Sequence, residues 1–386
     1  MPSQRSQHIN RAILLAALHP ESDSFRSLLA GSGPVLDWPW LIERSAAHKV
    51  VALLADRVAT MANEALIPAE ARQRLHDATL RASDRYAQAI RALEQVDRRL
   101  RQAGIEYVLM KGPVLTAQVY DRSAQRNFFD LDLLVREAEV DAAQSVLEQL
   151  GYRLWGGDRY LGFAPKGPDN QARATRAMRA ALRRFGHEVS LTTSDGSLLP
   201  IDLHWHLLPR GRIRRRAAAS LWENTTTTRL GAVDVRVLDR EATVLHLAMH
   251  AWSNRPWSFA LSHLCDFAWA LSRLPIDFQA LTRLADRWGG RADLARSLYA
   301  TEGVLAVGRP TQLQVDSTTS SLSDRFRRLA TPENLVEGCA CPAPKAWARL
   351  KRDIDWGIAI GSLNSTAILL LARYAALLCY HTARQR

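Results

Sequence analysis

Two aspartates interrupt an otherwise apolar run, "RNFFDLDLLV", at residues 126–135. Successive side chains of a β-strand point to opposite faces, so Asp130 and Asp132 are expected to project side by side from one face. The apolar neighbours expected on the other face are Phe129, Leu131 and Leu133. Two carboxylates held this close repel and raise one another's pKa, and a divalent cation is the simplest group to neutralise them. The run therefore predicts a strand that carries a metal site.

A further strand and turn precede this run, and a third acidic strand follows it. The sequence "IEYVLM" (105–110) predicts a buried strand, which is followed by a Lys-Gly-Pro turn at 111–113. A short helix is expected to continue to Tyr120, because proline is well placed in a first helical turn. Downstream, Asp202 lies in "LPIDLHWHLL", again an acid embedded in an apolar strand.

Helical patterns flank these strands. Apolar residues recur at three- and four-residue spacing between residues 8 and 100, and the pattern is helical again from about residue 240. A helix is also expected from Glu137 to Leu150, and "HEVSLTTSDGSLLPIDLHWHLL" (187–208) predicts two strands around a Ser-Asp-Gly-Ser turn. The predicted fold class is α+β, a small mixed β-sheet with helices on either side. The expected regions are N-terminal helices at 1–100, a core at 101–240 and a C-terminal helical domain at 241–386.

The chain is strongly basic, with a formal net charge of +12 over 386 residues. Its apolar fraction of 47% and charged fraction of 23% indicate a globular protein rather than a disordered one. Residues 164–216 hold eleven Lys or Arg against four Asp or Glu, mostly in the runs 173–184 and 210–216. These runs predict either a surface for an anionic partner, such as an acidic acceptor, nucleic acid or the triphosphate, or simply a solvated face. Base-stacking aromatic residues are sparse within them, so nucleic acid is not favoured.

Cysteine usage and hydropathy indicate a cytoplasmic protein without a membrane span. The four cysteines are too few for a disulfide framework and lack zinc-type spacing: Cys265, Cys339, Cys341 and Cys379. Residues 1–20 show no secretory signal. The most apolar segment, 366–380, is too short for a bilayer and contains Arg373, so a buried or amphipathic helix is expected there.

Two histidine pairs have spacings that could bind a transition metal. They are His204 and His206 in "HWH", and His246 and His250 in "HLAMH". The second pair lacks the glutamate of H-E-x-x-H, so His246 is expected to be an ordinary core or surface histidine. His204 is expected to point away from Asp202. His204 and His250 are retained as candidates for shaping a ligand pocket.

The order of these motifs resembles that of the polymerase-β-like nucleotidyltransferase superfamily: a strand, a phosphate-sized turn and helix, a D-x-D strand and a third acidic strand. It is more closely similar to an uncharacterised bacterial branch that carries Leu-Lys-Gly in place of the usual Gly-Ser turn. That branch continues with a Tyr, an Arg, "DIDLLV" and "DLHW". The matches here are "MKG" (110–112), Tyr120, Arg126, "DLDLLV" (130–135) and "DLHW" (202–205), within a similarity over roughly residues 30–310.

The resemblance implies a nucleotidyltransferase core with a metal-dependent site. Asp130, Asp132 and Asp202 are the implied catalytic residues and metal ligands, for two Mg²⁺ ions or alternatively Mn²⁺. The implied phosphate-binding residues are Lys111, Gly112 and Arg126, and His204 and His250 are added as candidates for shaping the nucleotide pocket. Two features depart from the superfamily pattern. The Gly-Ser hydroxyl is missing, and Phe128 and Phe129 stand where relatives often have smaller residues.

The implied reaction transfers a nucleoside monophosphate from a nucleoside triphosphate, by default ATP, to a hydroxyl acceptor. Relatives often lie beside genes for polysaccharide or modified-peptide biosynthesis, which implies a peptide, sugar or small-molecule acceptor. Kinase-type phosphoryl transfer and a non-catalytic nucleic-acid-binding or adaptor role stay open as alternatives. The C-terminal helices, with Trp252, Asn254 and Asp266, are expected to form a lid over the nucleotide. Truncation near residue 240 is then expected to abolish activity even if the core stays folded.

Overall fold

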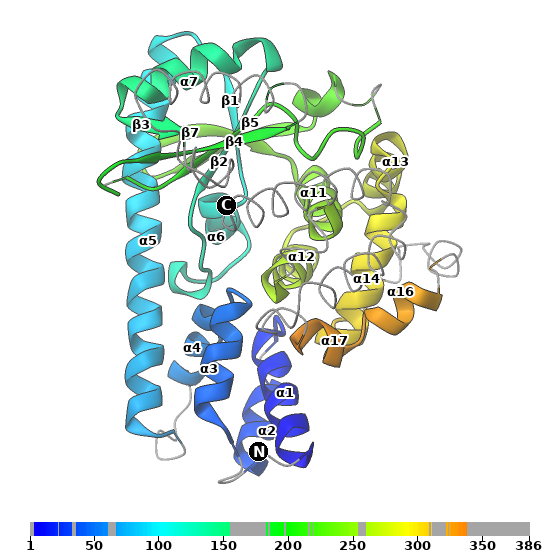
Figure 1. Cartoon of the computed structure of the whole chain (residues 1–386). Coiled ribbons are helices and arrows are strands. Elements are labelled where there is room, and N and C mark those ends of the chain that lie inside the picture. Colours follow the sequence, from blue (N-terminus) through cyan, green and yellow to red (C-terminus); the bar gives the residue numbers. More distant parts are fainter. Residues whose placement is uncertain are drawn as a thin grey trace, which may run out of the picture.

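A seven-stranded mixed sheet, in the order β3-β4-β5-β2-β1-β7-β6, lies in the upper part of the molecule as drawn in Figure 1. The computed structural model describes residues 4–337 except 22, 33–35, 61–66, 155–182, 184–185, 197, 215–216, 218, 254–259, 309, 311–321 and 323. The strands are β1 (Tyr107–Met110), β2 (Leu131–Val135), β3 (Tyr152–Leu154), β4 (Glu188–Thr193), β5 (Ile201–His204), β6 (Thr225–Leu230) and β7 (Val233–Leu238). The β2–β5 and β1–β7 pairs are parallel, and the other neighbouring pairs are antiparallel.

Helices surround the sheet on both faces and extend below it in Figure 1. Those that precede the sheet in sequence are α1 (Gln4–Leu18), α2 (Asp23–Ser32), α3 (Trp38–Ala47), α4 (Val51–Ala59) and α5 (Ala69–Gln102). Within the core region lie α6 (Gly112–Gln118), α7 (Val140–Gln149) and 3-10 turns at Ser123–Gln125, Glu137–Glu139 and Ala219–Glu223. The later helices are α11 (Arg240–Ser253), α12 (Leu261–Arg273), α13 (Phe278–Trp288), α14 (Arg291–Leu305), α16 (Asp324–Leu329) and α17 (Pro332–Glu337).

The two faces of the sheet bury different side chains of the same strands. Leu131, Leu133 and Val135 of β2 belong to an apolar cluster with residues of α5 and α7. Leu134 of β2 and Met110 of the neighbouring strand β1 belong to a second cluster, which is formed mainly by the other helices. The alternation expected in the aspartate-containing run is therefore present from Leu131 onward, and it directs Asp132 to the face opposite α5 and α7.

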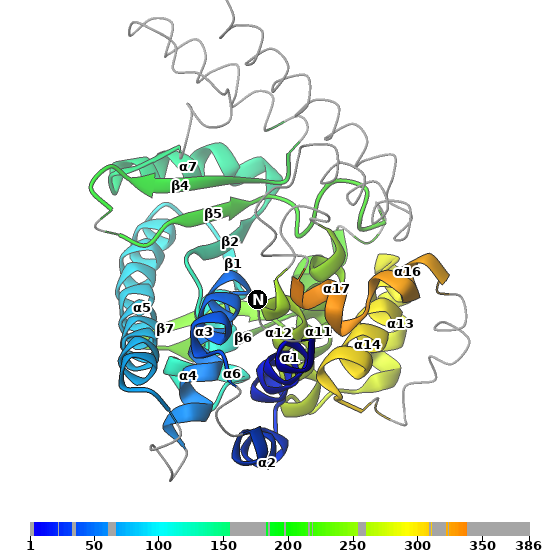
Figure 2. The same ribbon diagram turned by 60° about the horizontal axis from the view of Figure 1, so that its bottom comes forward.

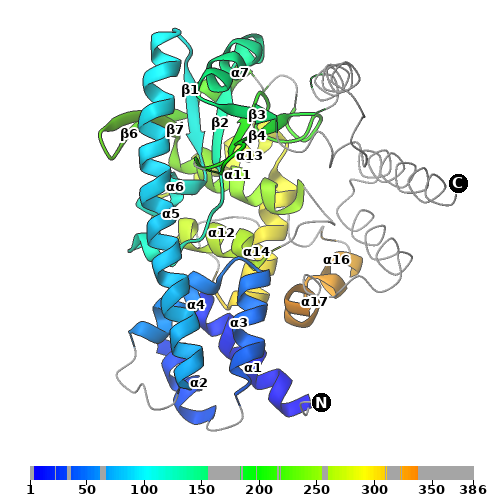
Figure 3. The same cartoon turned by 60° about the vertical axis from the view of Figure 1, so that its left-hand side comes forward.

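Helix α5 connects the two apolar clusters. Its buried positions recur every three or four residues, at Ala71, Leu75, Ala78, Ala82, Ala89, Ala92, Leu93, Val96 and Leu100. The first three belong to the cluster of the N-terminal helices, and the positions from Ala89 onward belong to the cluster between the sheet, α5 and α7. Figure 3 shows α5 running from α2, α3 and α4 to the sheet, so this one helix connects the N-terminal helices to the sheet.

The N-terminal and C-terminal helices share one apolar cluster, although more than a hundred residues separate them in the sequence. The indole of Trp269 on α12 donates to the carbonyl oxygen of Leu18 on α1 at 3.0 Å. The buried ring of His48 accepts from Leu261 N at 3.1 Å and contacts Val336 O at 2.7 Å. Figure 2 shows α1 beside α12, α14 and α17. The two helical regions therefore form one continuous body below the sheet.

The predicted α+β class with a mixed sheet and flanking helices is confirmed by this arrangement. The helices at 8–100, the strands at 105–110 and within 187–208, and the helix ending near Leu150 are all present, with shorter bounds. Strand β3 and the hairpin of β6 and β7 were not predicted. None of the described helices is long and apolar enough to cross a membrane. The segment 366–380 and most of the run 173–184 lie outside the described residues.

Candidate active site

Parallel pairing of β2 and β5 brings two of the predicted carboxylates together. Asp132 is in direct register with Asp202, and neighbouring strands lie about 4.8 Å apart. Ligand atoms of Asp132, Asp202 and His204 all lie within 4.8 Å of one another. Asp130 comes one residue before β2 and lines the same pocket. The three aspartates predicted from sequence are therefore gathered near the starts of the neighbouring strands β2 and β5.

The Lys111–Gly112 turn lies beside these carboxylates because β1 is antiparallel to β2, with Met110 opposite Asp132. The Lys111 ammonium is 2.8 Å from Asp132 Oδ1, and its backbone adopts a φ of 42°, which non-glycine residues rarely adopt. A Cβ on Gly112 would lie 3.2 Å from the carbonyl oxygen of Asp130. Glycine at 112 thus allows the turn to pack closely against the segment that carries Asp130.

Burial and mutual repulsion make the carboxylates electrostatically unequal. Burial, followed by the charge of Asp132, raises the pKa of Asp130 to about 6. Burial and the charges of Asp130 and Asp132 raise the pKa of Asp202 to about 7. Burial would also raise the pKa of Asp132, but the Lys111 ammonium and the His204 ring outweigh it and lower that pKa. Lys111 and His204 therefore compensate Asp132, whereas the cations among the described residues do not outweigh burial and repulsion at Asp130 and Asp202.

The position of His204 corrects the sequence-based expectation. Its Nε2 lies 3.0 Å from Asp132 Oδ1, so the ring lies beside the aspartates instead of pointing away from Asp202. Residues two apart on a strand share a face, and His204 is two residues after Asp202 on β5. The same rule that placed Asp130 beside Asp132 should have placed His204 beside Asp202.

Glu188 is a fourth carboxylate of the pocket that the sequence analysis missed. It lies opposite His204 in the antiparallel β4–β5 pair, and its Oε2 is 3.1 Å from His204 Nδ1. The paired residues are symmetric about Gly196 in the predicted Ser-Asp-Gly-Ser turn. Counting outward from that turn would have placed Glu188 next to His204, so the signal was present in the sequence.

Arg126 is held by a carboxylate from the C-terminal helices. Its guanidinium donates to both oxygens of Asp266 on α12, at 2.8 and 2.9 Å, and to the carbonyl oxygen of Gly112 at 3.0 Å. The Tyr120 hydroxyl donates to the same Asp266 carboxylate at 2.8 Å. Side-chain exposure of the Arg126–Asp266 pair is only 11% and 9%. Arg126 thus links α12 to the Lys111–Gly112 turn, whereas its predicted role as a phosphate clamp stays a prediction.

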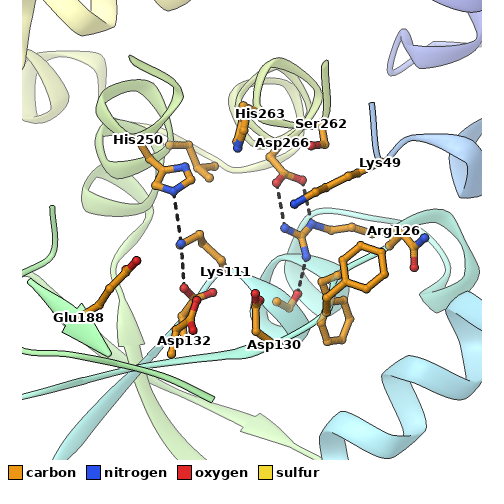
Figure 4. Close-up of a pocket in the computed structure, with 16 residues that line it drawn as sticks. Lys49, Lys111, Arg126, Asp130, Asp132, Glu188, His250, Ser262, His263 and Asp266 are labelled. Carbon is orange, nitrogen blue, oxygen red and sulfur yellow. Dashed lines mark hydrogen bonds and ion pairs between the residues drawn. The ribbon is translucent and has the colours of Figure 1, made fainter. Parts of the chain in front are cut away.

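The remaining wall of the pocket comes from both helical regions, around a cavity of about 200 Å³ (Figure 4). Lys111 lies between Asp132 and His250 of α11, whose Nε2 is 3.5 Å from the ammonium. Burial and the Lys111 charge keep the pKa of His250 well below its usual range, so this ring is neutral. Lys49, which precedes α4, reaches the pocket from the N-terminal helices. Phe129 also lines it, so the expectation that Phe129 faces the opposite side is wrong, because β2 begins only at Leu131.

The predicted lid and the basic run 210–216 occupy other places. Trp252 is fully buried and donates to Ser297 Oγ at 2.8 Å, so it belongs to the helical core and not to a surface over the pocket. Asp266 does line the pocket, whereas Asn254 lies outside the described residues. Arg210 pairs with Glu137 at 2.8 Å and Arg212 with Asp293 at 2.7 Å. Neither arginine lines the pocket among the residues described.

A mixed sheet that gathers carboxylates beside a strand–turn–helix segment is the arrangement of a nucleotidyltransferase. The model of the uncharacterised nucleotidyltransferase family matches residues 34–306, and the chain belongs to this family. No curated protein is significantly similar to the chain. Among solved structures, the chain is similar to the antibiotic-resistance factor ANT(2'')-Ia, known from a solution structure, at 13% sequence identity and a TM-score of 0.33. That similarity covers 52% of this chain and 90% of the other.

Proposed function

We propose that this nucleotidyltransferase transfers a nucleoside monophosphate from a nucleoside triphosphate to a hydroxyl acceptor, with release of pyrophosphate. The observation that carries the proposal is the register of β2 and β5, which places Asp132 beside Asp202 and next to the Lys111–Gly112 turn. Attack by a hydroxyl on a phosphate requires the phosphate charge to be neutralised and the attacking oxygen to be oriented. Carboxylates beside a lysine turn suit both requirements.

The residues fit a divalent metal of the Mg²⁺ type. Asp130, Asp132 and Asp202 offer only carboxylate oxygens, the donors that Mg²⁺ prefers, with Mn²⁺ as the alternative. The pKa values of Asp130 and Asp202 are raised because burial and their neighbours' negative charge oppose ionisation, so a bound cation would stabilise their ionised forms. Bound at these oxygens, one or two Mg²⁺ ions would supply charge neutralisation for the phosphates. The carboxylate oxygens would hold them, and Asp202 would also accept the acceptor's proton.

Other residues of the pocket have roles that follow from their positions. The Lys111 ammonium contacts Asp132 in this structure. Once Asp132 binds a cation, the ammonium can contact a phosphate oxygen instead. Gly112, which has no side chain, would let phosphate approach the backbone of the turn closely. Arg126 holds the carbonyl oxygen of Gly112 and so positions the turn. The neutral ring of His250 borders Lys111, and His204 orients Asp132.

ATP is the proposed donor, and a peptide, sugar or other small hydroxyl compound is the proposed acceptor. Transfer of only the terminal phosphoryl group would use the same residues, and the mass added to the acceptor separates the two reactions. The first test is calorimetric binding of ATP, GTP, CTP and UTP with and without Mg²⁺. We expect Mg²⁺-dependent binding by the wild type and its loss in Asp130→Ala/Asp132→Ala.

A matched control keeps this test specific. Asp141→Ala removes a carboxylate that is 83% exposed on α7 and does not line the pocket, so nucleotide binding should be unchanged. Equal binding by the wild type and the Asp130→Ala/Asp132→Ala variant would contradict the proposal. Absence of binding to every nucleotide would favour a non-catalytic adaptor role.

A further inference from the structure

A second potential metal-binding group lies beside the aspartates. His187 directly precedes β4, Glu188 begins it, and His204 ends the neighbouring strand β5. Their ligand atoms all lie within 4.8 Å of one another. The proposed transfer reaction assigns no role to His187, and it uses His204 only through the Nε2 that faces Asp132. The opposite side of the His204 ring, which faces Glu188, is thus unexplained.

Two of the three distances between these atoms match the edges of a metal coordination tetrahedron. Glu188 Oε2 lies 3.1 Å from His204 Nδ1 and 3.3 Å from His187 Nε2. Ligands about 2.0–2.1 Å from a tetrahedral Zn²⁺ are separated by about 3.3 Å. One carboxylate oxygen therefore stands at the right distance from two imidazole nitrogens for all three to share an ion.

The orientation of His204 favours metal binding at Nδ1. Nε2 faces Asp132 Oδ1 at 3.0 Å, so the Nε2–H tautomer would donate to the carboxylate and leave a lone pair on Nδ1. The ring is 3% exposed, and Nδ1 has no hydrogen bond from any described residue despite its 3.1 Å distance to Glu188. A carboxylate that holds the far nitrogen of a metal-binding histidine is a recurrent feature of metal sites.

We propose that His187, Glu188 and His204 form a site for a transition-metal dication, with Zn²⁺ as the best fit. Two imidazole nitrogens and one carboxylate oxygen form a donor set found at zinc sites that keep a fourth position open. Side-chain exposures of 18% for His187 and 33% for Glu188 give an ion access to the site, and Glu188 lines the pocket. Bound there, the ion would fix His204 and, through it, the orientation of Asp132.

The competing explanation is a protonated His204 that bridges Asp132 and Glu188 without a metal. Titration of the full-length protein with Zn²⁺ alone, by calorimetry, separates the two. Because Zn²⁺ also binds carboxylates, the titration is repeated on Asp130→Ala/Asp202→Ala, which removes two of the three aspartates of the proposed Mg²⁺ site. A parallel titration with Co²⁺ reports the ligand geometry through its visible absorption spectrum.

We expect one equivalent of Zn²⁺ bound by the wild type and retained by Asp130→Ala/Asp202→Ala. His187→Ala and Glu188→Gln each remove a proposed ligand. Each should weaken Zn²⁺ binding more than the loss of an outer-shell contact does, which is typically about 10–100-fold. Asp132→Asn, which alters the partner of His204, should fall within that range. His206→Ala is the matched control, because His206 lies two residues further on and contacts Glu137 instead.

No Zn²⁺ binding by the wild type would overturn the proposal, as would binding that survives both His187→Ala and Glu188→Gln. Circular dichroism confirms folding, and Glu188→Gln preserves size where a smaller residue might disturb β4. The outcome is independent of the transferase proposal. Asp130→Ala/Asp202→Ala should lose Mg²⁺–ATP binding and keep Zn²⁺, whereas His187→Ala should do the reverse.

Discussion

The buried pair of Arg126 and Asp266 gives the sharpest prediction about stability. Asp266→Asn keeps the size of the side chain but removes the charge that faces the guanidinium. The pair is 11% and 9% exposed and is joined by two hydrogen bonds of 2.8 and 2.9 Å. Removing one partner of such a buried pair leaves an uncompensated charge, which costs about 3–5 kcal/mol. We therefore expect Asp266→Asn to lower the free energy of unfolding by that amount.

The assay is urea unfolding followed by far-ultraviolet circular dichroism and tryptophan fluorescence, with Asp286→Asn as control. Asp286 forms a similar 2.8 Å contact with Arg291, but the two side chains are 54% and 43% exposed. Solvent screens this second pair, so its loss should cost no more than about 1 kcal/mol. Equal and small effects of the two substitutions would refute the reasoning, because burial would then not determine the value of the pair.

The same pair should also affect nucleotide binding, because Arg126 donates to the carbonyl oxygen of Gly112. Replacing both partners in Arg126→Met/Asp266→Leu removes the buried charges together, which is often neutral or stabilising. This double variant should regain much of the lost stability while its Mg²⁺–ATP affinity stays reduced. Normal affinity in the double variant would mean that the pair stabilises the fold without positioning the turn.

Three further substitutions test the pocket. Asp202→Asn should abolish Mg²⁺-dependent nucleotide binding yet stabilise the metal-free protein above neutral pH, as judged by urea midpoints. The sign follows from its pKa: burial raises it from 3.8 to about 7, so the favourable contribution of Asp202 is complete below pH 3.8 and disappears as the pH rises through 7. The wild type should therefore lose stability relative to the variant between pH 5 and pH 8, and a constant difference would argue against this. Gly112→Ala should destabilise the protein by about 1 kcal/mol or more, because φ is positive and a Cβ would lie 3.2 Å from Asp130 O, and it should weaken ATP binding in calorimetry. Lys111→Gln should weaken triphosphate binding more than binding of the nucleoside monophosphate, and equal losses would place Lys111 away from the outer phosphates.

The sequence alone predicted the strands and the turn of the site because both depend on local rules. Alternation within the aspartate run and the position of Lys111 after a buried strand need no tertiary information. The position of His204 beside Asp202 also follows from this alternation. The prediction that His204 points away from Asp202 failed only because the rule was not applied to β5. Glu188 needed the register of a hairpin, which the turn at Gly196 encodes.

Contacts between distant segments could not be predicted in this way. Lys49, between α3 and α4, reaches the pocket from a region whose periodicity shows only that its helices are amphipathic or buried. The pairing of Arg126 with Asp266 could not be predicted, because the two residues lie 140 residues apart in the chain. The hairpin of β6 and β7 was missed for a related reason: β6 is a run of four threonines with exposed positions and no apolar alternation.

The shared helical core changes what truncation near residue 240 should do. The sequence analysis expected this truncation to abolish activity even if the core stays folded. However, Leu18 and His48 of the N-terminal helices bond directly to α12, and the side chains around them form one apolar cluster with α11, α12 and α14. Removing those helices would expose that cluster to water, at roughly 25 cal/mol for each Å² of apolar surface. A chain ending at Asp239 should therefore be aggregated or partly unfolded in size-exclusion chromatography, whereas a monodisperse fragment with native circular dichroism would show that the sheet and α5 are sufficient to fold.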